Sequence, residues 1–165
     1  KGLEVIEAMR LYRLPLEQVS VVIHRQSIVH SLVEYWDGAV LAQLGTPDMR
    51  LPIRYAMTYP ARGESLAKPL DLTACPPLTF AAPDRATFPC LHLAEEAAAE
   101  GGTACAILNG ANEEAVRLFL QERIGFYDIS HLTAKARSAV SVVQKPSLED
   151  ILEADAAARR CVLGD

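Results

Sequence analysis

The chain has 165 residues and a mass of 18.0 kDa, which fits one medium-sized domain or two small ones. Half of its residues are hydrophobic and its formal net charge is −5, so a packed core can form and nucleic-acid binding is not expected. Its four cysteines are scattered, which favours free thiols in a reducing compartment. The sequence shows no long apolar run and no signal-peptide layout. We therefore expect a cytoplasmic protein without membrane contact.

The first predicted element is an amphipathic helix that ends near Tyr12, because apolar residues recur at helical spacing and Pro15 disfavours helix at the residue before it. The sequence starts at Lys1 without an initiator methionine, inside this helical pattern and without a capping residue before it. We therefore expect the chain to be a piece of a longer polypeptide.

A strand-rich region follows. Val19–Ile23 is a short, β-branched run that predicts a buried strand. Ile28–Tyr35 and Val40–Leu44 flank Asp37-Gly38, a dipeptide typical of tight hairpin turns. Both faces of Ile28–Tyr35 carry apolar residues, which predicts either a sheet covered on both sides or a contact with another subunit.

The hairpin leads into a predicted corner between strand and helix. Thr46 is suited to cap a helix, and Pro47 follows it where a missing N–H costs nothing. The helix should run from Asp48 to about Tyr59, with Pro52 tolerated in its first turn. Corners of this kind often hold binding sites. Residues 61–88 are rich in proline and predict an extended linker.

From residue 89 onward the sequence predicts helices, which together indicate a small four-helix bundle. A turn is expected at 109–112, where Asn112 is suited to cap the next helix. Ser147 and Asp150 have the spacing of a capping box. The predicted helices are Cys90–Glu100, residues 103–108, Glu113–Arg123, a segment from Asp128 or Ser130 to about Val143, and residues 148–162.

Composition and spacing alone do not specify a reaction. Glu4 and Glu7 share one side of the first helix, but two carboxylates are too few for a metal site, and a solvated helix face is favoured. His24 and His30 could act as acid–base groups, yet structural histidines are the better interpretation. Ser27 lacks the setting of a serine nucleophile.

Longer stretches of the sequence resemble 1-deoxy-D-xylulose 5-phosphate reductoisomerase, an NADPH-dependent and divalent-metal-dependent enzyme of isoprenoid synthesis. The resemblance extends in one order from Lys1 to the last predicted helix. Two positions depart from the family, with Arg25 in place of proline and Gly110 in place of alanine. The stretches that carry the resemblance are Lys1–Ala8, Val22–His24, Gln26–Ser31, Asp37–Arg50, Ile107–Asn109 and Ala111–Glu113.

The resemblance implies an α+β fold, in which the remnant of a sheet-containing catalytic domain (residues 1–60) is followed by a proline-rich linker (61–88) and a helical bundle (89–165). It also implies NADPH and Mg²⁺ or Mn²⁺ as cofactors and a sugar phosphate as substrate. Lys1, Glu4 and Ser27 would bind the substrate, Glu4 would also be a metal ligand, and Pro47 and Met49 would lie beside the nicotinamide.

The resemblance further implies that most of the enzyme lies upstream, including the other metal carboxylates and the whole NADPH domain. We therefore assign no catalytic residue here and expect the isolated chain to be inactive, although the full-length protein is an enzyme. A homodimer is also expected, from the mixed faces of Ile28–Tyr35 and from the family pattern. The alternative is a stand-alone, non-catalytic module that dimerises or binds a partner.

Overall fold

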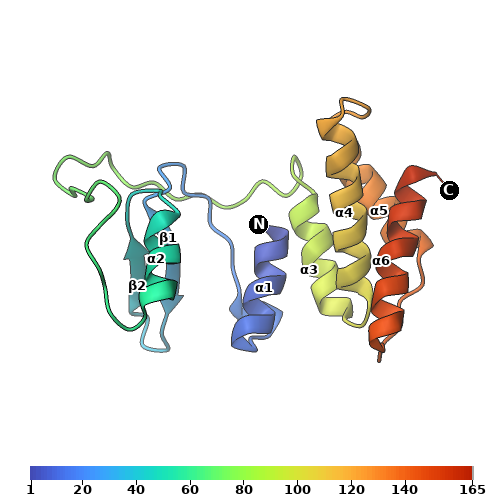
Figure 1. Ribbon diagram of the computed structural model, residues 1–165, viewed down its shortest axis with the longest axis horizontal. Helices are drawn as coiled ribbons and strands as arrows, with labels where there is room; N and C mark the ends of the chain where they lie inside the picture. Colours follow the sequence, from blue (N-terminus) through green and yellow to red (C-terminus); the bar gives the residue numbers. More distant parts are fainter. Residues whose placement is uncertain (165) are drawn as a thin grey trace. The chain divides into compact units, whose positions relative to one another are not determined.

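A computed structural model describes residues 1–164. It shows a mixed α+β fold, as the resemblance implied, with the elements labelled in Figure 1. In chain order these are α1 (Gly2–Tyr12), a 3₁₀ turn (Leu16–Gln18), β1 (Val29–Glu34), β2 (Val40–Leu44), α2 (Arg50–Thr58), α3 (Cys90–Glu100), α4 (Ala104–Leu120), α5 (Asp128–Ala139) and α6 (Leu148–Leu163).

The chain forms two compact units, and each is described by itself. The helical unit consists of Lys1–Val21 together with the chain from Asp84 onward. The hairpin unit consists of Val22–Pro83. The division into residues 1–60, 61–88 and 89–165 remains a prediction. None of the described helices is both long and apolar enough to span a lipid bilayer.

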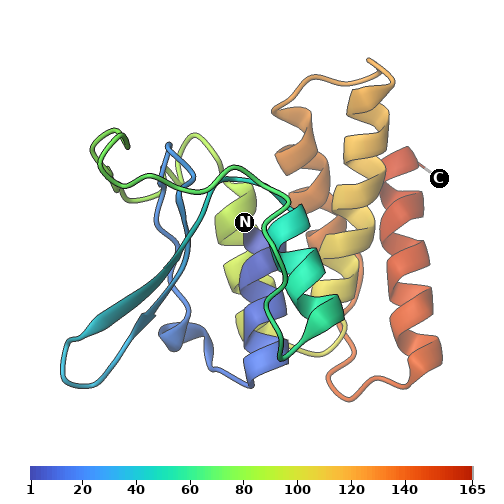
Figure 2. The same ribbon diagram turned by 60° about the vertical axis from the view of Figure 1, so that its left-hand side comes forward.

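The helical unit is built around α4, which packs against both α5 and α6, while α1 packs against α3 (Figures 1 and 2). Its core is rich in alanine, which lets helix axes approach closely. The largest fully buried apolar side chain is Ile107, at 1% exposure. The buried cluster around it comprises Ala111, Ala115, Leu118, Ile129, Ala136, Ala154, Ala158 and Val162.

Arginine side chains join the helices of this bundle across their outer surfaces. Arg137 of α5, whose side chain is 13% exposed, donates to Glu96 at 3.0 Å and to Glu100 at 2.9 Å, both on α3. Arg159 of α6 likewise contacts Glu113 of α4 at 2.5 Å. Because these guanidinium groups bridge separate helices, they fix the order of the bundle in addition to its apolar core.

The helix α4 is continuous, so the predicted turn at 109–112 is wrong. Gly110 lies in its interior, where an added Cβ would lie 2.6 Å from Oδ1 and 2.8 Å from the backbone oxygen of Asp155 on α6. The glycine therefore gives α6 room to approach α4. The dipeptide Asn109-Gly110 is a typical turn signal in a sequence, but here its glycine serves the packing of two helices.

The helix α5 begins at Asp128, one of the two predicted starts, but ends at Ala139, earlier than the expected Val143. The segment that follows is held by Thr103 instead. The backbone N–H of Thr103 donates to the Val143 carbonyl at 3.1 Å, and the Val143 N–H donates to the Thr103 hydroxyl at 3.0 Å. Thr103 therefore anchors the α5–α6 connection and does not cap α4 with its side chain.

The predictions for α1, α3 and α6 are confirmed. The helix α1 ends at Tyr12, and α3 spans Cys90–Glu100 as expected. The capping box of α6 is complete, since the Asp150 N–H donates to the Ser147 hydroxyl at 3.1 Å and the Asp150 carboxylate accepts from the Ser147 N–H at 2.8 Å.

In the hairpin unit, β1 and β2 pair antiparallel around the predicted turn. The Gly38 N–H donates to the Tyr35 carbonyl and the Tyr35 N–H to the Ala39 carbonyl, each at 2.9 Å. Gly38 has a φ of 82°, whereas Asp37 does not adopt positive φ. The connection is therefore a type I turn closed by a left-handed glycine, which matches the right-handed twist of the strands.

The predicted buried strand at Val19–Ile23 is wrong. Only Ile23 pairs, through two backbone hydrogen bonds of 2.8 and 3.0 Å with Ala81. Val22 and Ile23 are 45% and 37% exposed. β-branched residues favour an extended backbone, but a strand also needs a neighbour along its length, and the described residues provide one only at Ala81.

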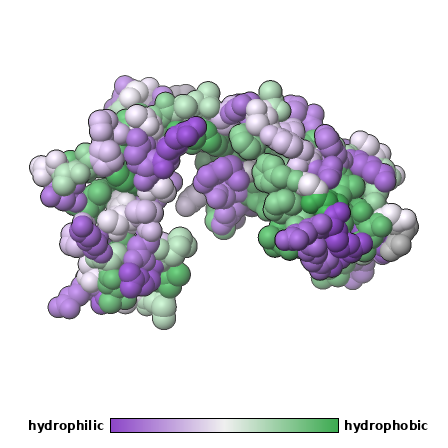
Figure 3. Space-filling model, turned by 90° about the horizontal axis from the view of Figure 1, so that it is seen from above, coloured by the Kyte–Doolittle hydropathy of each residue, from purple (hydrophilic) through white to green (hydrophobic). Residues whose placement is uncertain are grey.

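The hairpin itself is largely exposed. Ile28 is buried at its base, but Leu32, Val33 and Leu41 are 42%, 54% and 62% exposed. Hydrophobic side chains therefore reach the molecular surface in this unit (Figure 3). The two mixed faces expected from the sequence are present, and within the described chain they are not covered.

Candidate functional site

Lys1 and Glu4 lie together at the start of α1. The Lys1 Nζ is 2.5 Å from Oε2 of Glu4, and both side chains are 60% exposed. An ion pair this exposed contributes little to stability. Both charged groups are therefore accessible to a ligand. Glu7, one turn further along, is also exposed.

Gly2 allows this end of α1 to lie tightly on α3. A Cβ at Gly2 would lie 2.4 Å from the Ala94 Cβ and 3.2 Å from the Cys90 carbonyl oxygen, so no larger residue fits without a shift. Because Gly2 lies between Lys1 and Glu4, this close contact fixes the backbone that carries both side chains relative to α3.

A hollow of about 290 Å³ lies beside the pair. Its polar groups come from Lys1, Glu4 and Asn112, and its apolar part includes Leu108. Thr133 also lines it but is occupied, since its hydroxyl donates to the Ile129 carbonyl at 2.7 Å. The hollow therefore combines a charged pair from α1 with the Asn112 amide and apolar side chains from the bundle.

Two further features of this hollow matter for its chemistry. Cys90 lines it, and burial raises the pKa of this thiol, which favours the neutral form over a reactive thiolate. Asn112 also lines it, although the sequence predicted only a helix cap there. The sequence carried no signal for a ligand contact there, because an asparagine that follows Asn109-Gly110 is typical of a turn and a helix cap.

A divalent cation fits Glu4 as a partial site. The carboxylate is exposed and offers the hard oxygen ligands that Mg²⁺ and Mn²⁺ prefer. Among residues 1–164, no group of three or more histidine, cysteine, aspartate or glutamate side chains is arranged to hold a metal ion. Glu4 could therefore supply one ligand, with the others coming from elsewhere.

Ser27 lies in the hairpin unit, at the end of a tight turn. Its N–H donates to the His24 carbonyl at 3.2 Å, and its φ of 51° is unusual for a non-glycine residue. The neighbouring Gln26 fixes the turn by donating to the Pro77 carbonyl at 2.8 Å. Arg25, which replaces the family's proline, is exposed on this turn.

Both histidines of this region make structural contacts. His24 stacks on Phe80 at 4.7 Å, and its Nδ1 lies 2.8 Å from the Thr79 carbonyl, while its buried Nε2 has no partner among the described residues. The ring of His30 lies between the Ser27 carbonyl, at 3.0 Å, and Oε1 of Gln43, at 3.1 Å. These contacts hold the Ser27 turn against the hairpin.

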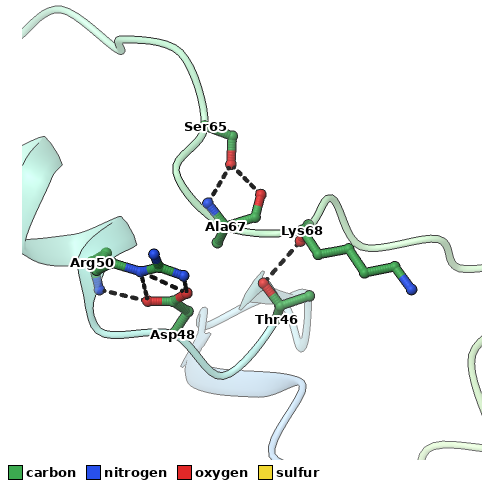
Figure 4. A network of polar contacts seen from close by, with 6 residues as sticks. All are labelled: Thr46, Asp48, Arg50, Ser65, Ala67 and Lys68. Atoms are coloured by element: carbon green, nitrogen blue, oxygen red, sulfur yellow. Dashed lines mark hydrogen bonds and ion pairs between the residues drawn. The ribbon is translucent and has the colours of Figure 1, made fainter.

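Pro47 and Met49 lie between β2 and α2. The corner is held by the contacts drawn in Figure 4, in which the Thr46 hydroxyl donates to the Lys68 carbonyl at 3.0 Å. The sequence predicted that Thr46 caps α2, and this is wrong, because Met49 is the N-cap residue. Met49 is 71% exposed. The Gly45 N–H donates to the Ile28 carbonyl at 3.0 Å, which places this corner and the Ser27 turn at the same end of the hairpin.

The Asp48 carboxyl group has a strongly lowered pKa at this corner. Hydrogen bonds from the Arg50 guanidinium and from the Arg50 backbone N–H lower the pKa of Asp48 to about 2. The carboxylate is therefore charged across the physiological range. The predicted site residues thus form two groups, with Lys1 and Glu4 in the helical unit and Ser27, Pro47 and Met49 in the hairpin unit.

Comparison with known proteins bears on both groups. The model of the family described as DXP reductoisomerase C-terminal domain matches residues 44–161. A 1-deoxy-D-xylulose 5-phosphate reductoisomerase of Acetivibrio thermocellus is 52% identical over 162 residues, covering 98% of this chain and 42% of the relative. Enzymes of the same name from a Synechococcus strain and from Bacillus cereus are 54% and 51% identical, covering 97% and 99% of this chain and 41% and 43% of the relatives.

Solved structures give the same result. A reductoisomerase from Zymomonas mobilis in complex with NADPH superposes with a TM-score of 0.91 at 44% identity, covering 99% of this chain and 43% of that one. A DOX-P reductoisomerase in complex with NADPH, fosmidomycin and magnesium superposes with a TM-score of 0.93 at 45% identity, covering 99% and 42%. The chain therefore spans about 42% of the length of the relatives it matches. It belongs to the 1-deoxy-D-xylulose 5-phosphate reductoisomerase family.

Proposed function

We propose that this chain is the C-terminal part of a cytoplasmic enzyme that converts 1-deoxy-D-xylulose 5-phosphate to 2-C-methyl-D-erythritol 4-phosphate for isoprenoid synthesis, with NADPH and Mg²⁺ or Mn²⁺. The observation that carries the proposal is identity of 51–54% with reductoisomerases over at least 97% of the chain. The matched stretches cover almost the whole chain, so they extend over both the helical unit and the hairpin unit.

In this proposal Lys1 and Glu4 have separate roles. The Lys1 ammonium binds the substrate, since a compact positive charge suits a phosphate or a polarised oxygen. Glu4 would supply a carboxylate ligand to the cation and would also contact the substrate. When bound, the cation stabilises negative charge on the substrate oxygens. The exposure of both side chains supports these roles.

The residues of the hairpin unit have binding roles in the same proposal. Ser27 binds the substrate, and the fixed turn around it supports a defined position for its hydroxyl. Pro47 and Met49 lie beside the nicotinamide, for which an exposed apolar side chain such as Met49 offers a contact surface. No residue of this chain is assigned to proton or hydride transfer.

The 165-residue chain by itself is expected not to turn over substrate. One carboxylate cannot fix a divalent cation, which takes six or more oxygen ligands. The test is spectrophotometric: the isolated chain should not oxidise NADPH when substrate and Mg²⁺ are added. Substrate-dependent oxidation by the pure chain would overturn this part of the proposal.

The role of Glu4 is tested in the full-length polypeptide by Glu4→Gln, with Glu7→Gln as the matched control on the same helix. Loss of a metal ligand should weaken Mn²⁺ binding at least about tenfold to a hundredfold, the range seen even for outer-shell partners. Glu7→Gln should leave Mn²⁺ affinity and turnover within about twofold, because Glu7 is a solvated side chain. Equal effects of the two substitutions would contradict the assignment.

A homodimer is the second part of the proposal, in which exposed apolar residues of the hairpin form the subunit contact. Val33 and Leu41 are paired neighbours on one face of the hairpin and Val40 lies on the other face, and all three are more than half exposed. Exposed apolar residues that lie side by side are typical of a protein contact surface. Sedimentation of the full-length protein should give a dimer that Leu41→Asp shifts toward monomer. A wild-type monomer at high concentration would contradict this part. It would also contradict the alternative that the chain is a stand-alone module that dimerises.

A further inference from the structure

We propose that Asn112, on α4 of the helical bundle, is a substrate-contacting residue of the Lys1–Glu4 site and binds a hydroxyl group of the ligand. This inference rests on the proposed function and extends it, because it makes the bundle part of the substrate site. It starts from the hollow of about 290 Å³ that Lys1, Glu4 and Asn112 line together.

The position of Asn112 in α4 is the first argument. The residue lies inside a 17-residue helix, where asparagine is less favourable than alanine by about 0.6 kcal/mol. Gly110, two residues earlier, is another residue of low helix propensity, and it has a packing reason in the close approach of Asp155. Asn112 has no such reason within the core. It lines the hollow together with Leu108, one turn before it on the same helix face.

The chemistry of the hollow is the second argument. Lys1 supplies a cation and Glu4 an anion, so these two groups suit the charged parts of a ligand and its metal ion. The Asn112 amide is neutral and offers both donors and an acceptor. A hydroxyl group has the same dual character, so an amide beside a charged pair suits a polyhydroxylated phosphate ester. The hollow is also of the size of small-ligand sites.

The rigidity of the arrangement is the third argument. Gly2 holds α1 against α3 at a distance that excludes a Cβ, and α4 is fixed on both sides by the core around Ile107. Asn112, Lys1 and Glu4 therefore belong to one packed unit. A hydrogen bond made from such a preformed site loses little conformational entropy on binding.

The test compares Asn112→Ala with Asn109→Ala in the full-length polypeptide. Asn109 is the matched control, because it lies on the same helix, is also half-buried and does not line the hollow. Calorimetry measures the binding of 1-deoxy-D-xylulose 5-phosphate with Mg²⁺, and fluorescence measures the binding of NADPH. Loss of one hydrogen bond of about 1.4 kcal/mol corresponds to a tenfold higher Kd for the phosphate ester.

We expect Asn112→Ala to raise that Kd and the KM for the ester about tenfold, with the Kd of NADPH and the thermal midpoint equal to those of Asn109→Ala. An unchanged Kd for the ester, or an equal rise in Asn109→Ala, would overturn the inference. If the wild-type protein binds the ester without turning it over, the proposed reaction is wrong and the Kd ratio still decides the role of Asn112. If the wild-type protein does not bind the ester, both proposals are wrong.

Discussion

The helical unit and the hairpin unit differ in how much apolar surface the chain itself covers. In the helical unit, α4 is surrounded by α5 and α6, and its inward residues, such as Ile107 and Ala111, are at most 1% exposed. In the hairpin unit, Trp36 at the turn is fully exposed, and Val33 and Leu41 are more than half exposed. The two units have similar kinds of residues but very different burial.

The difference shows where the stability of this chain resides. Burial of apolar area is the main favourable term in folding, so the helical unit supplies most of it. The hairpin unit instead depends on local polar contacts, such as those of Gln26, His30 and Thr46, and its apolar faces are available to another surface. Each prediction below tests one side of this comparison.

The largest effect is expected for Ile107→Ala. The side chain is fully buried between α4 and its neighbours, and removal of such a side chain costs about 3 kcal/mol through lost transfer free energy and a cavity. Urea unfolding followed by helical circular dichroism measures the change. Leu41→Ala, at an exposed hairpin position, should change the unfolding free energy by no more than about 0.5 kcal/mol when the protein is dilute. Equal losses at the two positions would show that the hairpin has a core of its own.

A smaller effect is expected where α1 joins the bundle. Gly2→Ala would place a methyl group 2.4 Å from the Ala94 Cβ, so α1 must move away from α3 at a cost of about 1–3 kcal/mol. Hydrogen exchange should show protection lost in α1 and retained in α4. The double variant Gly2→Ala with Ala94→Gly restores the space and should recover part of the protection in α1. Failure of this rescue would mean that the contact does not determine how α1 docks.

The capping box of α6 should have an effect of about 1 kcal/mol. Ser147→Ala removes the hydroxyl that accepts from the Asp150 N–H, a loss typical of an N-cap. Hydrogen bonds from the backbone N–H and hydroxyl of Ser147 lower the pKa of Asp150. A carboxyl pKa lowered by folding stabilises the folded state above its unfolded value and loses this contribution as the pH falls through the folded value.

The difference in unfolding free energy between wild type and Ser147→Ala should therefore shrink in acid, below the usual carboxyl range of about pH 4. Ser138→Ala on α5 is the control, because among the described residues this exposed hydroxyl bonds only to the Ala134 carbonyl within its own helix, at 3.1 Å. It should have almost no effect at any pH. A pH-independent difference for Ser147→Ala would contradict reciprocal capping.

Sequence-based prediction succeeded where a feature depends on adjacent residues and failed where it depends on residues far away in the chain. The capping box at Ser147, the hairpin turn at Gly38 and the end of α1 were predicted correctly, because each depends on a few adjacent residues. The predicted turn at Gly110 was wrong, because this glycine makes room for Asp155 on another helix. Val19–Ile23 was wrong because strand formation depends on a partner that local propensity does not specify.

The candidate site shows the same limit. Composition and spacing found Glu4 and Glu7 but could not separate them, and only the resemblance distinguished Glu4. The importance of Asn112 was not visible, because the hollow that it shares with Lys1 and Glu4 forms only when α1 docks on the bundle. A site assembled from helices that are about a hundred residues apart in sequence has no short motif.

The smallest effect on stability is expected at the corner of the hairpin unit, where a shift in pKa replaces a change in unfolding. Arg50→Ala removes the guanidinium that bonds Asp48, so the Asp48 pKa should rise from about 2 toward the usual value of about 4. The rise should be incomplete, because the backbone N–H of residue 50 still donates to the carboxylate at 2.9 Å. Carbon-detected NMR titration of the Asp48 carboxyl group measures this directly.

Arg62→Ala is the control for charge alone, because Arg62 lies over the Tyr55 ring in the same unit and makes no contact with Asp48 within the described chain. The Asp48 pKa should stay near 2 in that variant. Since folding lowers this pKa, the contact favours the folded corner above about pH 4 and loses its effect between about pH 4 and pH 2. Over that interval the corner should loosen. The helical unit has acid-sensitive carboxylates of its own, Glu114 and Asp150, so its signal is compared between wild type and Arg50→Ala and should be the same in both at each pH. A helical signal that differs between these two proteins would mean that the corner and the helical unit unfold as one.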